Sequence, residues 1–115
     1  MLVDVARFLS VIAILEGGPH PPQAYGPYGI CPAVLRDVNA RKGWSHTVAD
    51  LADPAVSRAV AVEHLAWLES CLTARGIPRT VEILAGCWRA GLSGCLQGKG
   101  RTYGERAAAL YREAP

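Results

Sequence analysis

The 115-residue sequence contains no apolar stretch that approaches the roughly 20 residues of a membrane-spanning helix. It also has no Cys-x-x-Cys pair, so we expect neither a zinc site nor any other bound metal. Glycine and proline account for 12 and 8 residues, but they follow no collagen-like or low-complexity period. The sequence therefore predicts a globular chain without a membrane span, a metal or a repetitive segment.

The motifs of several enzyme classes are missing as well. There is no His-Glu-x-x-His zinc motif and no nucleophile elbow. Residues 98–102 (GKGRT) lack the first half of a phosphate-binding loop, so we interpret them as a flexible basic loop. The first fifteen residues carry one Arg and one Asp and lead to no small-residue cleavage site, so we expect no signal peptide. None of these classes is indicated.

The composition is that of one soluble domain spanning residues 1–115, because half of the residues are hydrophobic and 19% are charged. The net charge is +2, but residues 73–115 alone carry seven Lys or Arg against three acids. This basic third indicates either an anionic partner or a solvated helix face. The isoelectric point of 8.4 is below the value of about 9 that is typical of nucleic-acid binders. We therefore expect no nucleic-acid partner, and a small helical DNA binder is the weakest of our alternatives.

Apolar spacing, proline and glycine together predict a mainly α fold of about five helices. The expected helices cover residues 3–16, 32–42, 53–75, 78–90 and 103–113. Residues 17–29 are too rich in Gly and Pro for a helix, and residues 91–100 are expected to form a second loop. Short strands within residues 19–30 remain an open alternative. We expect the chain to be a monomer.

Four cysteines, at positions 31, 71, 87 and 95, allow three disulfide pairings, and the sequence selects none of them. Cys71 and Cys87 each follow a leucine by three residues, as core positions of a helix do. The spacing predicts that most of the cysteines are buried. A pairing between Cys87 and Cys95 remains open.

Glu16 is the residue that bears most directly on function. The apolar positions of the first helix, continued by four residues from Ile12, lead to Glu16, which is followed by two glycines. Partial burial of a carboxyl group disfavours its ionised form, which suits a general acid near neutral pH. The alternative is a solvated glutamate at a frayed helix end. By contrast, His64 on the long helix is interpreted as a core histidine rather than a catalyst.

Several short sequence segments resemble segments of the lysozyme-like transglycosylase (SLT-type) family. Residues 14–18 (ILEGG) are similar to the family's E-S-G-G segment, and residues 25–32 (YGPYGICP) resemble its Y-G-x-x-Q-I-x-P segment. Residues 32–39 (PAVLRDVN) and 51–58 (LADPAVSR) look like a phage and bacterial branch of the superfamily. Residues 88–91 (WRAG) resemble Y-N-A-G, and residues 103–111 resemble the family's closing Y-x-x-R-V helix. These segments occur in the same order as in the family and cover nearly the whole chain.

The resemblance implies a lysozyme-like fold that cleaves the β-1,4 bond between N-acetylmuramic acid and N-acetylglucosamine in peptidoglycan. The partners would be peptidoglycan glycan strands, and no cofactor or metal would be needed. Glu16 would protonate the leaving glycosidic oxygen and then act as the base, without a second protein carboxylate. Asp37 and Asp50 are the other carboxylates considered, and we interpret them as a solvated helix charge and a turn or cap residue. Action would be on the cell wall, by a phage-delivered enzyme or by a domain of a larger exported protein.

The resemblance also implies substrate-binding residues at Tyr25, Tyr28, Gly29, Arg89 and Tyr103. The Gly/Pro-rich loop would form one wall of a cleft with Glu16 at its floor. Two positions depart from the family pattern, because Gly29 replaces its Gln and Arg89 replaces its Asn. These departures leave two readings open: an active peptidoglycan glycosidase, or a module that keeps the fold and binds glycan without cutting it. Trp88 is interpreted as a core residue.

Overall fold

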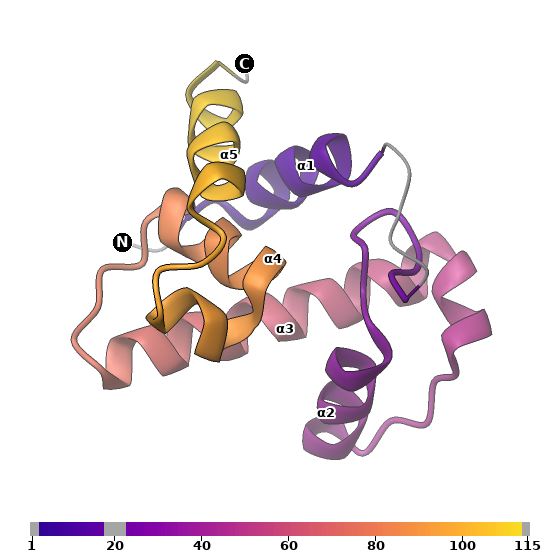
Figure 1. The fold of residues 1–115 in the computed structure, drawn as a ribbon. Coiled ribbons are helices and arrows are strands. Elements are labelled where there is room, and N and C mark those ends of the chain that lie inside the picture. The colour runs from indigo at the N-terminus through magenta and orange to yellow at the C-terminus, as the bar shows by residue number, and fades with distance from the viewer. Residues whose placement is uncertain (1–2, 18–22, 114–115) are drawn as a thin grey trace. The chain divides into compact units, whose positions relative to one another are not determined.

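The computed structural model describes residues 3–17 and 23–113, and this part of the chain is mainly helical (Figure 1). It contains five α-helices and one short 3₁₀ helix, η1. Their bounds are α1 Val5–Leu15, α2 Pro32–Lys42, η1 Val48–Ala52, α3 Pro54–Ala74, α4 Val81–Leu96 and α5 Arg101–Glu113. The described residues form no strand, and their one isolated β-bridge joins Tyr25 to Ile30. The predicted mainly α class is confirmed.

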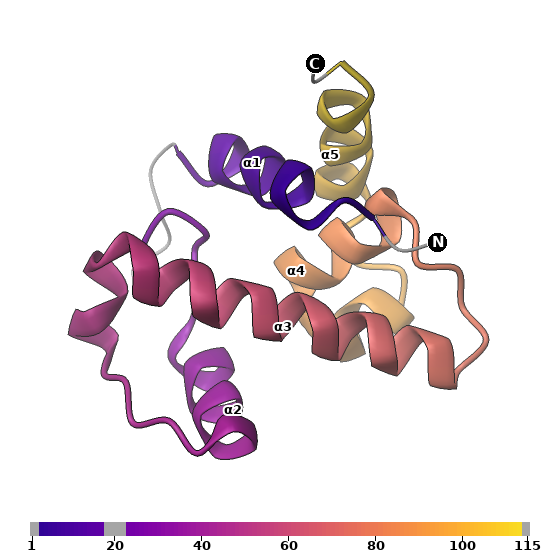
Figure 2. The same ribbon diagram turned by 180° about the vertical axis from the view of Figure 1, so that it is seen from behind.

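Contacts divide the chain into two compact units. Unit 1 comprises residues 1–12 and 65–115, and unit 2 comprises residues 13–64. Figure 2 shows α3, the longest helix, along its full length. None of the described helices is long and apolar enough to cross a bilayer.

In unit 1 the start of α1 supplies apolar side chains at helical spacing. Phe8 and Leu9 are fully buried, and the Phe8 ring lies edge-on to Trp88, with 5.9 Å between their centroids. Arg7 lies over the ring of Tyr111 at 5.0 Å, and the Tyr111 hydroxyl accepts a hydrogen bond from the backbone N–H of Asp4. These contacts attach the N-terminal segment to helices α4 and α5.

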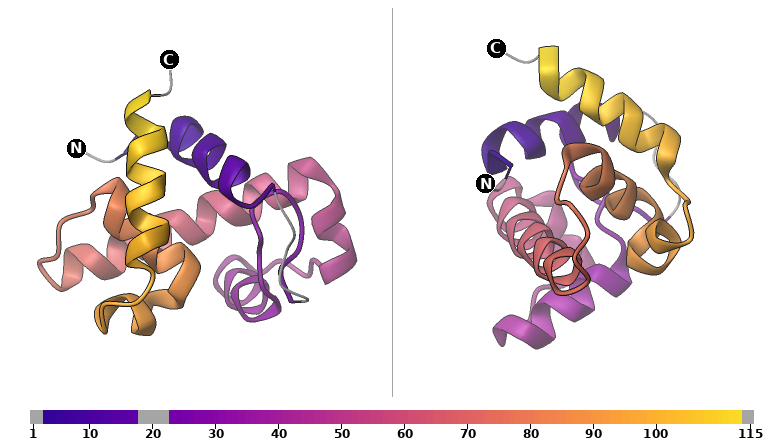
Figure 3. Two further views of the ribbon diagram at one scale, coloured as in Figure 1. Left: turned by 45° about the horizontal axis from the view of Figure 1, so that its top comes forward. Right: turned by 90° about the vertical axis from the view of Figure 1, so that its left-hand side faces the viewer.

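Helices α4 and α5 pack against each other so closely that their backbones are nearly in contact (Figure 3). Gly104 on α5 is buried, and a Cβ atom there would collide with the backbone oxygen of Glu82 on α4. Four residues earlier, a Cβ atom at Gly100 would lie 2.5 Å from the backbone oxygen of Gly86. The two glycines therefore set the separation of the two helices.

We expect Gly104→Ala to destabilise unit 1. Overpacking of this kind costs about 1–3 kcal/mol. The higher helix propensity of alanine returns at most about 1 kcal/mol. The control is Glu105→Ala, an exposed position on the same helix, with an expected change within about 0.5 kcal/mol. Urea unfolding of both variants measures the difference, and equal free energies of unfolding would contradict the close approach.

Unit 2 contains α2, η1 and the first part of α3. Helix α2 begins with Pro32 and ends at Gly43, whose φ of 69° lies in the left-handed region favoured by glycine. Thr47 and Asp50 form a capping box that begins η1: the Thr47 hydroxyl accepts from the Asp50 N–H, and the Asp50 carboxylate accepts from the Thr47 N–H. This hydrogen bonding lowers the pKa of Asp50 and confirms its role as a cap.

Helix α3 begins at the segment that the sequence reads as LADPAVSR. Asp53 accepts a hydrogen bond from the backbone N–H of Ala55 at 2.9 Å, just before Pro54 starts the helix. The buried Ser57 hydroxyl donates to the backbone oxygen of Leu51 at 2.6 Å. These bonds fix the turn between η1 and α3.

One expectation about element bounds is wrong. Helix α4 does not end near residue 90: helical structure resumes after Gly91, whose φ of 76° and ψ of 163° kink the helix, and continues to Leu96. The bounds of α1 (Val5–Leu15) and α5 (Arg101–Glu113) lie within two residues of the expected ranges 3–16 and 103–113. The predicted bounds of α2 are confirmed.

The expectation that most cysteines are buried is wrong. Only Cys87 is buried, whereas Cys31, Cys71 and Cys95 are partly exposed, and all four are free thiols. Helical spacing places Cys71 beside the buried Leu68 and Leu72, but Cys71 itself is partly exposed. Spacing alone does not separate a core position from its margin.

Candidate active site

Glu16 follows the last residue of α1 and keeps only 8% of its surface exposed. The helical stripe that includes Ile12 therefore does carry a carboxylate out of solvent, as the spacing indicates. The alternative of a solvated glutamate at a frayed helix end is excluded by this burial. Gly17 ends the helix, and its N–H donates to the backbone oxygen of Ile14 at 3.2 Å.

The turn over residues 25–30 lies against this carboxylate. A Cβ atom added at Gly29 would collide with the Glu16 carboxyl oxygen Oε1 and would lie 2.8 Å from its Cδ. Gly29 has a φ of 61°, which L side chains rarely adopt. Only a glycine meets both conditions, and so the Glu16 carboxyl group rests against a bare stretch of backbone.

Backbone hydrogen bonds hold the turn in this position. The N–H of Tyr25 donates to the backbone oxygen of Ile30, and the N–H of Ile30 donates to that of Tyr25, each at 2.9 Å. Gly26 anchors the turn, because a Cβ atom there would lie 2.5 Å from the Ser57 hydroxyl oxygen. The turn is thereby fixed between Glu16 and the η1–α3 junction within unit 2.

The turn carries two tyrosines, Tyr25 and Tyr28, and both are half-buried. Tyr25 lies at the β-bridge and Tyr28 near the tip of the turn, next to Gly29. Rings of this kind that keep an exposed face can stack on a sugar. The structure therefore brings Glu16, Gly29 and two tyrosines together in one unit.

Arg89 and Tyr103, the other two predicted substrate-binding residues, lie in unit 1. The exposed Arg89 places its guanidinium carbon 5.8 Å from the centroid of the Tyr103 ring, a cation–π arrangement. The structure thus brings these two residues to each other. A cleft that joins them to Glu16 stays a prediction, as do their roles in binding substrate.

The long helix carries His64, which is buried as its spacing indicates. Burial, with a smaller effect of the Arg41 charge, lowers its pKa from 6.5 to about 4. The imidazole is therefore neutral in the folded protein at neutral pH, in keeping with a core histidine rather than a catalyst.

This shift makes stability depend on pH. Above pH 6.5 His64 is neutral in both the folded and the unfolded chain, and its contribution to the free energy of unfolding is fully present. As the pH falls toward 4, only the unfolded chain gains the proton, so the free energy of unfolding falls by about 3 kcal/mol. We expect His64→Leu to remove this part of the pH dependence, measured by urea unfolding at pH 7 and pH 4.5. An unchanged difference between the two pH values would contradict it.

A buried carboxyl group that sequence reasoning missed is Glu69 on α3, in unit 1. Its exposed fraction is 6%, and among the described residues its Oε2 atom has no hydrogen-bond partner. Burial raises its pKa, and the charge of Arg79 opposes the shift. A polar position on an apolar helical stripe was the available signal, because Leu68 and Leu72 flank it. Asp37, considered earlier as a carboxylate, is exposed on α2.

Among the described residues, no group of three or more His, Cys, Asp or Glu side chains is placed to hold a metal ion. The chain matches no family model, no curated protein and no solved structure.

Proposed function

We propose that this chain is a peptidoglycan glycosidase that cleaves the β-1,4 bond between N-acetylmuramic acid and N-acetylglucosamine, with Glu16 as its acid. The observation that carries the proposal is the buried Glu16 carboxyl group at the end of α1, packed against Gly29. The family-like sequence segments, which occur in order from residue 14 to residue 111, support the same class of reaction.

The chemistry asks for one proton donor at the glycosidic oxygen. A carboxyl group placed beside the glycosidic oxygen can donate a proton to it as the bond breaks. Once it has given up the proton, the same group can accept one from the attacking hydroxyl. If the attacker is the muramic 6-hydroxyl, the product is a 1,6-anhydro sugar; if it is water, the product is a reducing sugar.

Tyr25 and Tyr28 would hold the sugar rings, since both belong to the turn that contacts Glu16 and both are only half-buried. Gly29 would act differently from the glutamine of the family pattern. It has no side chain that could donate a hydrogen bond to a sugar, and its contribution is the space that the Glu16 carboxyl group occupies. We propose that Arg89 supplies a polar contact to the glycan or its peptide.

The test is digestion of purified cell walls, followed by mass spectrometry of the soluble products. We expect disaccharide–peptide fragments, and their masses distinguish the two attackers because an anhydro product is one water lighter than a hydrolysed one. A folded chain that sediments with the walls but releases nothing would instead support the second reading, a glycan-binding module without activity. The Gly29 and Arg89 departures favour that reading.

A further inference from the structure

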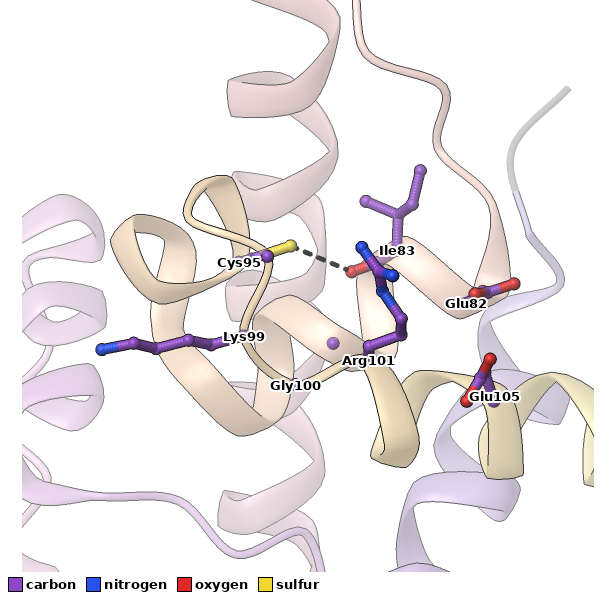
Figure 4. Close-up of a pocket in the computed structure, with 9 residues that line it drawn as sticks. Glu82, Ile83, Cys95, Lys99, Gly100, Arg101 and Glu105 are labelled. Atoms are coloured by element: carbon purple, nitrogen blue, oxygen red, sulfur yellow. Dashed lines mark hydrogen bonds between the residues drawn. The ribbon is translucent and has the colours of Figure 1, made fainter.

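Three of the four cysteines gather in unit 1, outside the candidate active site. Cys87 is fully buried on α4, one helical turn after Ile83, and Cys95 and Cys71 both lie close enough to raise its pKa. The Cys95 thiol in turn donates to the backbone oxygen of Ile83 at 3.6 Å (Figure 4). The Cys95 thiol thus lies beside the helical turn of α4 that runs from Ile83 to Cys87.

The kink at Gly91 makes this contact possible. In a straight α-helix, residues twelve apart are separated by about 18 Å and residues eight apart by about 12 Å. The Cys95 thiol nevertheless reaches the backbone oxygen of Ile83, twelve residues earlier, and its proximity raises the pKa of Cys87, eight residues earlier. The chain turns back at Gly91, whose positive φ suits glycine, and so brings the end of α4 onto its own first half.

A pocket of about 410 Å³ opens onto one of these two thiols. Cys95 lines it, together with Ile83 and the loop from Gly98 to Arg101. The volume is in the range that holds small organic ligands. Cys87 is not part of the lining and has no exposed surface. A small reagent that enters the pocket can therefore reach Cys95, whereas Cys87 is shielded from it.

We propose that Cys95 and Cys87 form an oxidisable pair that closes a disulfide across the Gly91 kink by exchange with a small-molecule disulfide entering this pocket. The proposal is independent of the proposed glycosidase activity. In the first step, the Cys95 sulfur, as a thiolate, attacks one sulfur of the reagent. A mixed disulfide forms at Cys95, and one reagent thiolate leaves and takes up the proton that Cys95 lost.

In the second step, Cys87 gives its proton to solvent, and its sulfur attacks the Cys95 sulfur of the mixed disulfide. The second reagent thiolate leaves and is protonated. The two protein thiols are oxidised by two electrons, and the reagent disulfide is reduced to two thiols. Burial raises the pKa of Cys87, which lowers the fraction of its reactive thiolate in this step.

The experiment treats the folded chain with glutathione disulfide and follows its intact mass. We expect wild type to lose 2 Da relative to the reduced protein and to end with no glutathione attached, because a disulfide replaces two thiols. Peptide mapping should place the bond between Cys87 and Cys95. In Cys87→Ser the second step is impossible, so one stable glutathione adduct should remain on Cys95.

Two matched controls complete the test. Cys71→Ser keeps the pair and should behave as wild type, whereas Cys95→Ser removes the accessible thiol and should slow the reaction of Cys87 at least tenfold. Circular dichroism confirms that each variant is folded. A stable glutathione adduct on wild-type Cys95, a bond that maps to another pair, or no reaction at Cys95 would each overturn the proposal.

Discussion

Glu16→Gln is expected to abolish the release of soluble fragments from purified cell walls. The amide has the shape of the carboxyl group but no proton to give to the glycosidic oxygen, and general acid catalysis accounts for about 10²–10⁴ in rate. The neutral amide fits the space beside Gly29, so the fold should persist. Fragment release, measured for equal amounts of folded wild type and variant, gives the ratio.

The matched control for this change is Glu113→Gln, the same substitution at an exposed position in the last turn of α5. It should leave fragment release unaltered. Sedimentation of both variants with intact walls separates binding from cleavage, and we expect Glu16→Gln to bind as wild type does. Equal release from wild type and Glu16→Gln would show that another group is the acid.

Gly29→Ala is expected to combine a large loss of stability with a loss of cleavage. The left-handed backbone costs a non-glycine residue roughly 1–2 kcal/mol. The new methyl group must also displace the Glu16 carboxyl group, and overpacking adds about 1–3 kcal/mol. The displaced carboxyl group can no longer occupy its place beside the turn. Urea unfolding and fragment release measure the two effects.

Gly43→Ala is the control for backbone strain alone. Gly43 has a φ of 69°, close to the 61° of Gly29, but a Cβ atom there meets nothing within 4 Å. It should therefore lose only about 1–2 kcal/mol and keep full activity. If the two alanine variants are equally stable, the contact between Gly29 and Glu16 is not tight.

A double-mutant cycle tests that contact directly. Removing the carboxyl group with Glu16→Ala gives the Gly29→Ala methyl group room, so the second substitution should cost less in this background than in wild type. The remaining cost should approach that of Gly43→Ala, since only the backbone strain is left. Additive effects would contradict direct packing between the two residues.

Local signals account for the parts of the fold that the sequence could predict. Helix α2 has Pro32 at its first turn and Gly43 at its end, and these two residues act on the backbone without help from the rest of the chain. Glu16 could be placed at a buried position because helical spacing extends directly from Ile12. In both cases the cause lies within one turn of the residue concerned.

The features that were not predicted depend on contacts between distant segments, or on local sequence signals that favour more than one backbone structure. Gly91 was expected to end a helix; it does turn the chain, but helical hydrogen bonding resumes after it. The 3₁₀ helix η1 was missed although its capping box, Thr47 and Asp50, is visible in the sequence. That Gly29 makes room for Glu16 could not be read from sequence, because the contact joins two segments through the fold.

The backbone contact between α4 and α5 also restricts which second mutations could repair a damaged chain. A clash with a side chain can be relieved by trimming that side chain, but Gly100 and Gly104 face the main-chain oxygens of Gly86 and Glu82, which every residue carries. A genetic screen that begins from Gly104→Ala should therefore find no suppressor at position 82, however small the new residue is. Suppressors should instead map to distant positions that raise stability throughout unit 1, or revert the alanine itself.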